Sequence, residues 1–167
     1  SLADAVDAPQ LTEEELTAII GEAHDLGRKV AAHAHGAEGA KRAIRAGIDS
    51  IEHGTFLDDE ALTMMKQKGV VLIPTLMAVQ GLREQMDNPR AMAPAVRLKA
   101  QAAMAALATT FKRALAMGVT IGLGTDAGVY PHGRNNEEFH QMVDLGMRPI
   151  DALKADVASG AKHPKRV

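Results

Sequence analysis

The order of apolar and polar residues along the chain predicts alternating helices and strands. Apolar side chains recur every three or four positions over residues 16–26, which predicts an amphipathic helix. This helix begins after the capping-box pair Thr12 and Glu15 and ends at Gly27. Residues 29–35, which follow, form a segment between Gly27 and Gly36 that is too short for a helix, so a buried strand is predicted there.

The same unit of helix, glycine and strand recurs along the rest of the chain. Further helices are expected over residues 37–46, 58–68, 95–117, 137–145 and 150–158, and further strands over residues 48–53, 70–75 and 119–124. Residues 77–94 contain Asn88 and Pro89 and predict a loop or a helical insert. Because strands that alternate with helices pair in parallel through right-handed crossovers, we expect an α/β fold.

The number of strands limits the architecture. A closed (β/α)8 barrel needs eight strands and about 250 residues, whereas four strands are expected here. Two α/β arrangements remain: half of such a barrel, or a small doubly wound sheet. Either one leaves an open sheet with two unpaired edges. No linker with a shift in composition interrupts residues 1–167, so a single structural unit is expected.

Composition excludes several classes of function. The net charge is −2 and aromatic residues make up 2% of the chain, which argues against a nucleic-acid partner. The absence of cysteine excludes disulfides and thiolate ligands. No apolar run approaches the ~20 residues of a membrane span, so no membrane partner is expected. Residues 1–9 lack the pattern of a secretory signal; a cytoplasmic location is the default expectation, and the compartment stays unknown.

Polar side chains gather where the expected strands end. His33 and His35 close the first strand, His53 the second and Thr75 the third, and Asp126 follows the fourth by two residues. The carboxyl ends of parallel strands form the edge at which α/β proteins place their sites. Any one of these residues alone is readily explained as a satisfied polar residue at the rim. Their combination on successive strands predicts a functional site.

The residue types in this cluster suit a metal. His33 and His35 are two apart on a strand and therefore project to one face. Two imidazoles and the Asp126 carboxylate are natural ligands for a borderline divalent ion such as zinc. The spacing is neither that of a zinc finger nor that of a helical H-E-x-x-H motif. It indicates a catalytic site assembled from different strands, in which Asp126 ligates the metal, accepts a proton from a metal-activated water, or does both.

Two other kinds of chemistry are poorly supported. Ser50 and Ser159 lack the G-x-S-x-G elbow of a nucleophilic serine. Gly122, Gly124 and Gly128 resemble a dinucleotide-binding loop, but the third glycine comes one residue late and no helix follows directly. These glycines more simply allow a sharp turn beside the carboxylate.

Several segments resemble metal-dependent amidohydrolases. Residues 33–40 (HAHGAEGA) and 46–54 (AGIDSIEHG) resemble strands five and six of that superfamily, and residues 124–128 (GTDAG) resemble its strand-eight motif. Residues 129–133, 138–142 and 146–153 are similar to the branch of imidazolonepropionase-like enzymes, zinc-dependent Xaa-Pro dipeptidases and arginine/lysine carboxypeptidases. The resemblance covers residues 12–161. It implies a partial (β/α)8 TIM barrel that holds strands five to eight with their helices.

The resemblance also implies roles for individual residues. His33 and His53 would be metal ligands, and Asp126 would bind the metal and the attacking water and pass its proton to the leaving amine. His35 would contact substrate or support the metal ligands without binding the metal itself. Three residues of the loop after strand eight would also meet substrate: Tyr130, His132 and Arg134. Arg134 is equally readable as a solvated loop charge.

The chain departs from the family pattern in its ligand set. The strand-one His-x-His pair and the carboxylated lysine that ends strand four have no counterpart, so about three of five or six ligands are present. An alternative assigns His33 and His35 to the strand-one pair, but the IEHG ending of residues 51–54 some 20 residues later favours strands five and six.

The resemblance implies an enzyme that hydrolyses amide or peptide C–N bonds in dipeptides or N-acyl amino acids with one or two zinc ions. The isolated half is expected to have little or no activity, with the N-terminal half missing or replaced by a homo-oligomer. The alternatives are a non-catalytic half-barrel that self-associates, or a small doubly wound domain that binds an anion.

Overall fold

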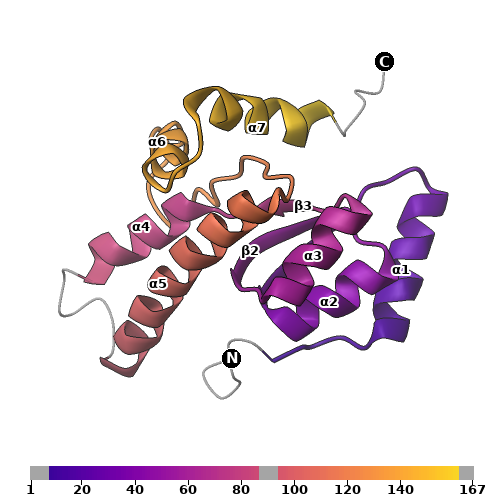
Figure 1. Ribbon diagram of the computed structural model, residues 1–167. Coiled ribbons are helices and arrows are strands. Elements are labelled where there is room, and N and C mark those ends of the chain that lie inside the picture. Colours follow the sequence, from indigo (N-terminus) through magenta and orange to yellow (C-terminus); the bar gives the residue numbers. More distant parts are fainter. Residues whose placement is uncertain (1–7, 87–93, 162–167) are drawn as a thin grey trace.

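The computed structural model describes residues 8–86 and 94–161, which form a three-stranded parallel sheet and surrounding helices (Figure 1). The sheet order is β1-β2-β3, with β1 at Ala31–Gly36, β2 at Ser50–Phe56 and β3 at Val71–Ile73. The helices are α1 (Glu13–Asp25), α2 (Ala37–Ala46), α3 (Asp59–Lys68), α4 (Leu76–Met86), α5 (Pro94–Met117), α6 (Glu137–Asp144) and α7 (Pro149–Ala161). The predicted α/β class and parallel pairing are confirmed.

Local sequence signals fix the helix ends. The capping box before α1 is present, because Thr12 Oγ1 accepts the Glu15 N–H while the Glu15 carboxylate accepts the Thr12 N–H. The Asp58 side chain caps α3 in a similar way. Gly47 and Gly69 end α2 and α3 in the left-handed conformation that glycine tolerates best. These helix limits therefore follow from residues next to one another in the sequence.

The expected fourth strand is reduced to a single bridge. Ile121 pairs with Leu72, the Leu72 N–H donates to the Thr120 carbonyl, and the Gly122 N–H donates to the Leu72 carbonyl. The prediction of a strand over residues 119–124 was therefore wrong in its extent. Pairing stops early because β3 itself ends before Pro74, which has no N–H to continue a ladder.

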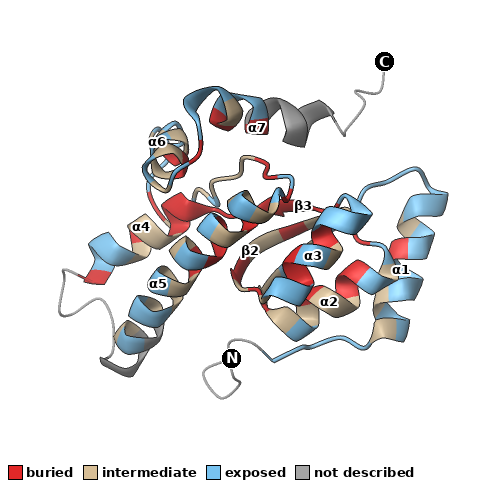
Figure 2. Ribbon diagram, in the orientation of Figure 1, coloured by how far each residue is buried: buried red, intermediate tan, exposed pale blue. Residues whose placement is uncertain are grey.

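The hydrophobic core lies between the sheet and its helices (Figure 2). Helices α2 and α5 pack on the sheet, α3 packs against both of these helices, and α1 lies outside α2 (Figure 1). The largest fully buried apolar side chains include Ile44, Ile51, Leu62, Leu72 and Phe111. This core holds the strands that carry the polar cluster.

The opposite face of the sheet is hollow. A cavity of about 630 Å³ is lined by Ala31 of β1, by Ser50 and Glu52 of β2, and by Ile73 of β3. These residues share one face because side chains alternate along a strand. The concave shape agrees with the expectation of part of a barrel rather than a sheet covered on both faces.

Two further predictions were made. One concerns the segment between β3 and α5, and the other concerns membrane-spanning helices. Residues 76–86 form α4, so the expected helical insert is confirmed there, and Asn88 and Pro89 lie outside the described residues. Among the helices that the structure describes, none is both long and apolar enough to cross a membrane.

Candidate metal centre and active site

Three imidazoles from two strands meet at the edge of the sheet. The ring centroids of His33 and His35 on β1 are 4.7 Å apart. The His53 ring on β2 lies 4.4 Å from the His33 ring and 4.9 Å from the His35 ring. One nitrogen from each ring lies within 4.8 Å of the other two. The residues that the sequence placed at neighbouring strand ends thus converge on a small volume.

A bulge in β2 brings His53 into this group. His53 pairs with Ala34 across the two strands. Ala34 lies between His33 and His35, so its side chain projects to the face of β1 opposite to theirs. In a regular strand the His53 side chain would therefore point to the opposite face. Instead φ is +68° at His53 and +60° at Gly54, and β2 has one more residue than β1 before Phe56 pairs with Gly36. His53 consequently lies inside β2, not at its end as expected.

Two threonine hydroxyls hold the imidazoles. His35 Nδ1 lies 2.8 Å from Thr55 Oγ1, and His53 Nδ1 lies 2.7 Å from Thr75 Oγ1. The Thr75 hydroxyl donates its proton to the Pro74 carbonyl at 2.8 Å. A hydroxyl has one proton, so donation to Pro74 leaves Thr75 to accept from His53, and this pairing assigns the His53 hydrogen to Nδ1. The lone pair of His53 is then on Nε2, available to a metal.

The cluster favours neutral imidazoles. Burial, followed by the neighbouring His53 and His33, lowers the pKa of His35 to about 4, although Asp126 opposes the shift. Burial and then His33 also lower the pKa of His53, again opposed by Asp126. The neutral forms of His35 and His53 have free lone pairs, and their closeness to the His33 ring suits a divalent cation of the zinc type. The residues therefore fit the metal that the sequence predicts.

Asp126 lies near the imidazoles but outside the tight group. Its negative charge raises the pKa of His35 and His53, so it acts on both. Within the described chain, however, the group of possible ligand atoms comprises the three histidines without Asp126, whose side chain is exposed. The structure thus offers His35 as a third nitrogen ligand, beside the sequence-based prediction of Asp126.

Backbone strain is concentrated at this site. Among the described non-glycine residues, a positive φ occurs at His53 within β2, at Thr75 just after β3 and at Asp126 after the Ile121 bridge. Such conformations cost about 1–3 kcal/mol each and persist only where the surroundings enforce them. For the β-branched Thr75, with φ at +51°, the conformation is unusual. The strain marks the same edge as the imidazoles.

The loop after Ile121 holds the other predicted substrate contacts. Tyr130 is buried, and its hydroxyl donates to Asn135 Oδ1 at 3.5 Å. His132 is exposed. The Arg134 guanidinium forms ion pairs with Glu84 at 2.8 Å and with Glu137 at 2.7 Å. Arg134 therefore ties this loop to α4, and a contact between substrate and any of the three loop residues stays a prediction.

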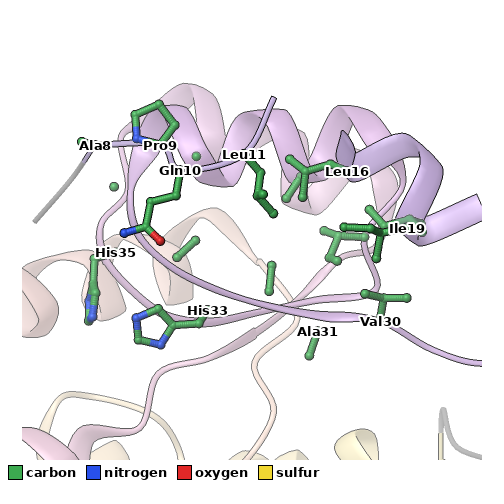
Figure 3. A pocket seen from close by; sticks show the side chains of 17 residues that line it. Ala8, Pro9, Gln10, Leu11, Leu16, Ile19, Val30, Ala31, His33 and His35 are labelled. Atoms are coloured by element: carbon green, nitrogen blue, oxygen red, sulfur yellow. The ribbon is translucent and has the colours of Figure 1, made fainter. Parts of the chain in front are cut away.

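A groove runs from the imidazoles along the outer edge of β1. This cavity of about 530 Å³ lies between β1 and α1, and Figure 3 shows His33 and His35 at one end and Leu16 and Ile19 at the other. The side chain of Gln10 points toward the two histidines (Figure 3). The groove is therefore polar at the candidate metal centre and apolar away from it.

Sequence reasoning missed three residues of this region. Thr55 supports His35 but carries no motif of its own. Glu52 is half-buried beside His33 in the register, and burial raises its pKa, as does the charge of Asp126. Glu138 is buried and reaches the backbone at the start of α4. The two glutamates lie in the IEHG and EFHQM segments that resemble the family, and this is the sequence signal that could have pointed to them.

Comparison with known proteins identifies the family. The sequence profile described as "Amidohydrolase family" matches residues 3–165, which is nearly the whole chain. The chain belongs to the amidohydrolase family. The resemblance inferred from the histidine and aspartate motifs is thereby confirmed.

Solved structures support the same assignment for this amidohydrolase chain. A Xaa-Pro dipeptidase with bound methionine in the active site superposes with a TM-score of 0.90 at 44% identity, over 97% of this chain and 40% of that chain. The ochratoxinase of Aspergillus niger gives a TM-score of 0.81 at 34% identity, over 91% of this chain and 34% of that chain.

Curated relatives show how much of a longer protein this amidohydrolase chain corresponds to. The Aspergillus niger ochratoxinase is 34% identical over 151 residues, which are 90% of this chain and 31% of that protein. An uncharacterized Mycobacterium tuberculosis protein is 36% identical over 152 residues, 89% of this chain and 40% of that protein. The chain thus spans about a third of the length of the curated relatives it matches.

Proposed function

We propose that this chain is the C-terminal half, strands five to eight, of an amidohydrolase barrel that hydrolyses amide or peptide C–N bonds. The observation that carries the proposal is the convergence of His33, His35 and His53 at the carboxyl edge of a parallel sheet. The similarity to a Xaa-Pro dipeptidase supports dipeptides or N-acyl amino acids as the substrate class.

The residues divide into metal ligands and proton carriers. His33 and His53 would hold zinc, one or two ions in the complete site, with Asp126 or His35 as a further ligand. When bound, such an ion supplies Lewis-acid polarisation of the substrate carbonyl. Asp126 takes a proton from the attacking water and gives it to the departing amine, so that the C–N bond breaks with the charges balanced.

The remaining candidates would position the substrate. His35, if it does not ligate the metal, faces the same volume as His33 and His53 and can contact the scissile group. Tyr130, His132 and Arg134 lie in the loop that follows Asp126. Because Arg134 is already paired with Glu84 and Glu137, it would meet a substrate carboxylate only by sharing or exchanging these partners.

The proposal predicts weak hydrolysis that depends on Asp126. We expect the purified chain with Zn²⁺ to hydrolyse Xaa-Pro dipeptides or N-acyl amino acids far more slowly than full-length amidohydrolases, because the other ligands are missing. Asp126→Asn should lower that residual rate by about 100-fold or more, since general acid–base catalysis contributes about 10²–10⁴. Initial rates measured by amine release, with a chelated sample as the blank, test this.

Two outcomes would contradict this prediction. Hydrolysis that persists after chelation or in Asp126→Asn would show that the observed rate does not come from this site. Rates as high as those of full-length relatives would show that the isolated half is a competent enzyme on its own.

Self-association is a second candidate role, and the outer edge of β1, which no strand pairs with among residues 8–86 and 94–161, favours it. Ala31 and His33 on β1 are exposed, as are Leu11 and Ile19 beside the groove. An unpaired strand edge with apolar neighbours invites pairing with another chain. We expect two copies to associate through these edges, and sedimentation velocity at micromolar concentration should show a dimer that Ile19→Lys weakens. A stable monomer over the whole concentration range would contradict the idea.

A further inference from the structure

The carboxylate of Glu138 caps a helix that is remote from it in the sequence. Glu138 lies in the first turn of α6 and is 0% exposed. Its Oε1 accepts the Leu76 N–H at 2.9 Å, and its Oε2 accepts the Met77 N–H at 2.8 Å. Leu76 and Met77 begin α4, and the first N–H groups of a helix have no acceptor within it. Glu138 therefore fixes the start of α4.

The residue just before this capped start holds a candidate metal ligand. Thr75 is directly followed by Leu76, has φ at +51°, and is 4% exposed. Its hydroxyl accepts the Nδ1–H of His53 and donates to the Pro74 carbonyl. A strained threonine keeps such a position only if its neighbours hold the backbone. The two N–H···carboxylate bonds one and two residues later provide that restraint.

Glu138 also lies at the end of the loop that carries Asp126. The Glu138 N–H donates to the Asn135 carbonyl, so the carboxylate and the last turn of the loop are joined. One side chain thus links the β3–α4 junction to the segment that follows Asp126. Burial raises the pKa of Glu138 to about 7, while the Met77 and Leu76 N–H groups oppose the shift. If residue 138 only had to fill space in the core, an apolar side chain would do so without the cost of desolvating a carboxylate.

We propose that Glu138 is a positioning residue for the metal centre: by holding the N–H groups of Leu76 and Met77, it keeps the Thr75 hydroxyl on Nδ1 of His53. Thr75 in turn keeps the His53 lone pair on Nε2, where it is available to a metal. The proposal rests on the proposed function in so far as His53 ligates a metal. Its structural part, the tautomer of His53, is independent of any metal.

The first test reads the tautomer in the metal-free chain. Long-range ¹H–¹⁵N spectra of the full chain labelled in histidine distinguish Nδ1–H from Nε2–H, and the His53 signals are those lost in His53→Ala. We expect Nδ1–H in the wild type and a mixture of tautomers in Glu138→Gln, because the glutamine amide has one acceptor oxygen for two N–H donors. The matched control is Glu137→Gln, which changes the neighbouring, partly exposed carboxylate.

The second test reads metal affinity. We expect Glu138→Gln to weaken Zn²⁺ binding about 10- to 100-fold, the range found when a group that orients a metal ligand is removed. Glu137→Gln should stay within about twofold. If Glu138→Gln does not fold, Glu138→Asp keeps the charge but is one methylene too short to reach both N–H groups, and the same two shifts are expected in weaker form.

The outcomes separate this proposal from the proposed function. Nε2–H at His53 in the folded wild type overturns the positioning role outright, as do Glu138 variants with unchanged tautomer and affinity. If the tautomer shifts in Glu138→Gln but the wild type binds no Zn²⁺, the positioning role stands and the metal-dependent function fails. If Zn²⁺ binds through His53 while Glu138→Gln changes neither readout, the reverse holds.

Discussion

Replacing His53 with alanine is expected to weaken the binding of Zn²⁺ by more than 100-fold. His53 contributes one of three nitrogens within 4.8 Å of one another, and the other two come from the exposed edge strand β1. Removing a group that merely orients a ligand already costs about 10- to 100-fold, so loss of the ligand itself should cost more. Isothermal titration of the metal-free chain, with bound Co²⁺ spectra as a second readout, measures the change.

The control for this experiment is His140→Ala, which removes an exposed imidazole from α6 and should leave the affinity unchanged. The same titration decides the third ligand. A larger loss in His35→Ala than in Asp126→Asn favours three nitrogens, and the opposite order favours the carboxylate predicted from sequence. Full Zn²⁺ affinity in His53→Ala would remove the basis for a metal centre at this edge.

Substituting Gly54 with alanine should destabilise the fold strongly. At φ +60°, a Cβ on residue 54 would lie 2.7 Å from Leu72 Cδ1 and 2.9 Å from Leu57 Cδ1, two side chains with almost no exposed surface. The left-handed conformation costs about 1–2 kcal/mol and the overpacking a further 1–3 kcal/mol. Urea unfolding should therefore show a loss of about 2–5 kcal/mol in the free energy of unfolding.

Gly69→Ala is the matched control for this prediction. Gly69 also has a positive φ, +69°, but a Cβ there would meet no atom within 4 Å. Only the conformational cost of about 1–2 kcal/mol is expected. The difference between the two variants isolates the close approach of β2 to β3 beside His53. Equal losses would mean that the backbone at Gly54 is no more constrained by packing than that of an ordinary helix end.

The ends of helices could be predicted from the sequence more accurately than the ends of strands. Helix α2 was predicted with the limits that the structure has, because Gly47 ends it locally. The fourth strand was overestimated, since its pairing depends on how far β3 extends before Pro74. Whether a strand pairs depends on its neighbour, and that neighbour is distant in the sequence.

The candidate site divides in the same way. His33, His35, His53 and Asp126 were identified from strand-end positions and from motifs that resemble the family. The bulge that turns His53 toward the other imidazoles was not foreseen, because strand alternation alone directs it to the opposite face. The ion pairs of Arg134 with Glu84 and Glu137 could not be anticipated either, because Glu84 is 50 residues away.

The sequence by itself determined the order of helices and strands, the caps that limit them and the residue types of the candidate site. Each of these depends on side chains and backbone groups within a few positions of one another. Tertiary structure alone brought the Thr75 hydroxyl to Nδ1 of His53 and the carboxylate of Glu138 to the start of α4. The reason is that Glu138 is more than 60 residues from Leu76 and Met77, and hydrogen bonds between such distant groups produce no local pattern in the sequence.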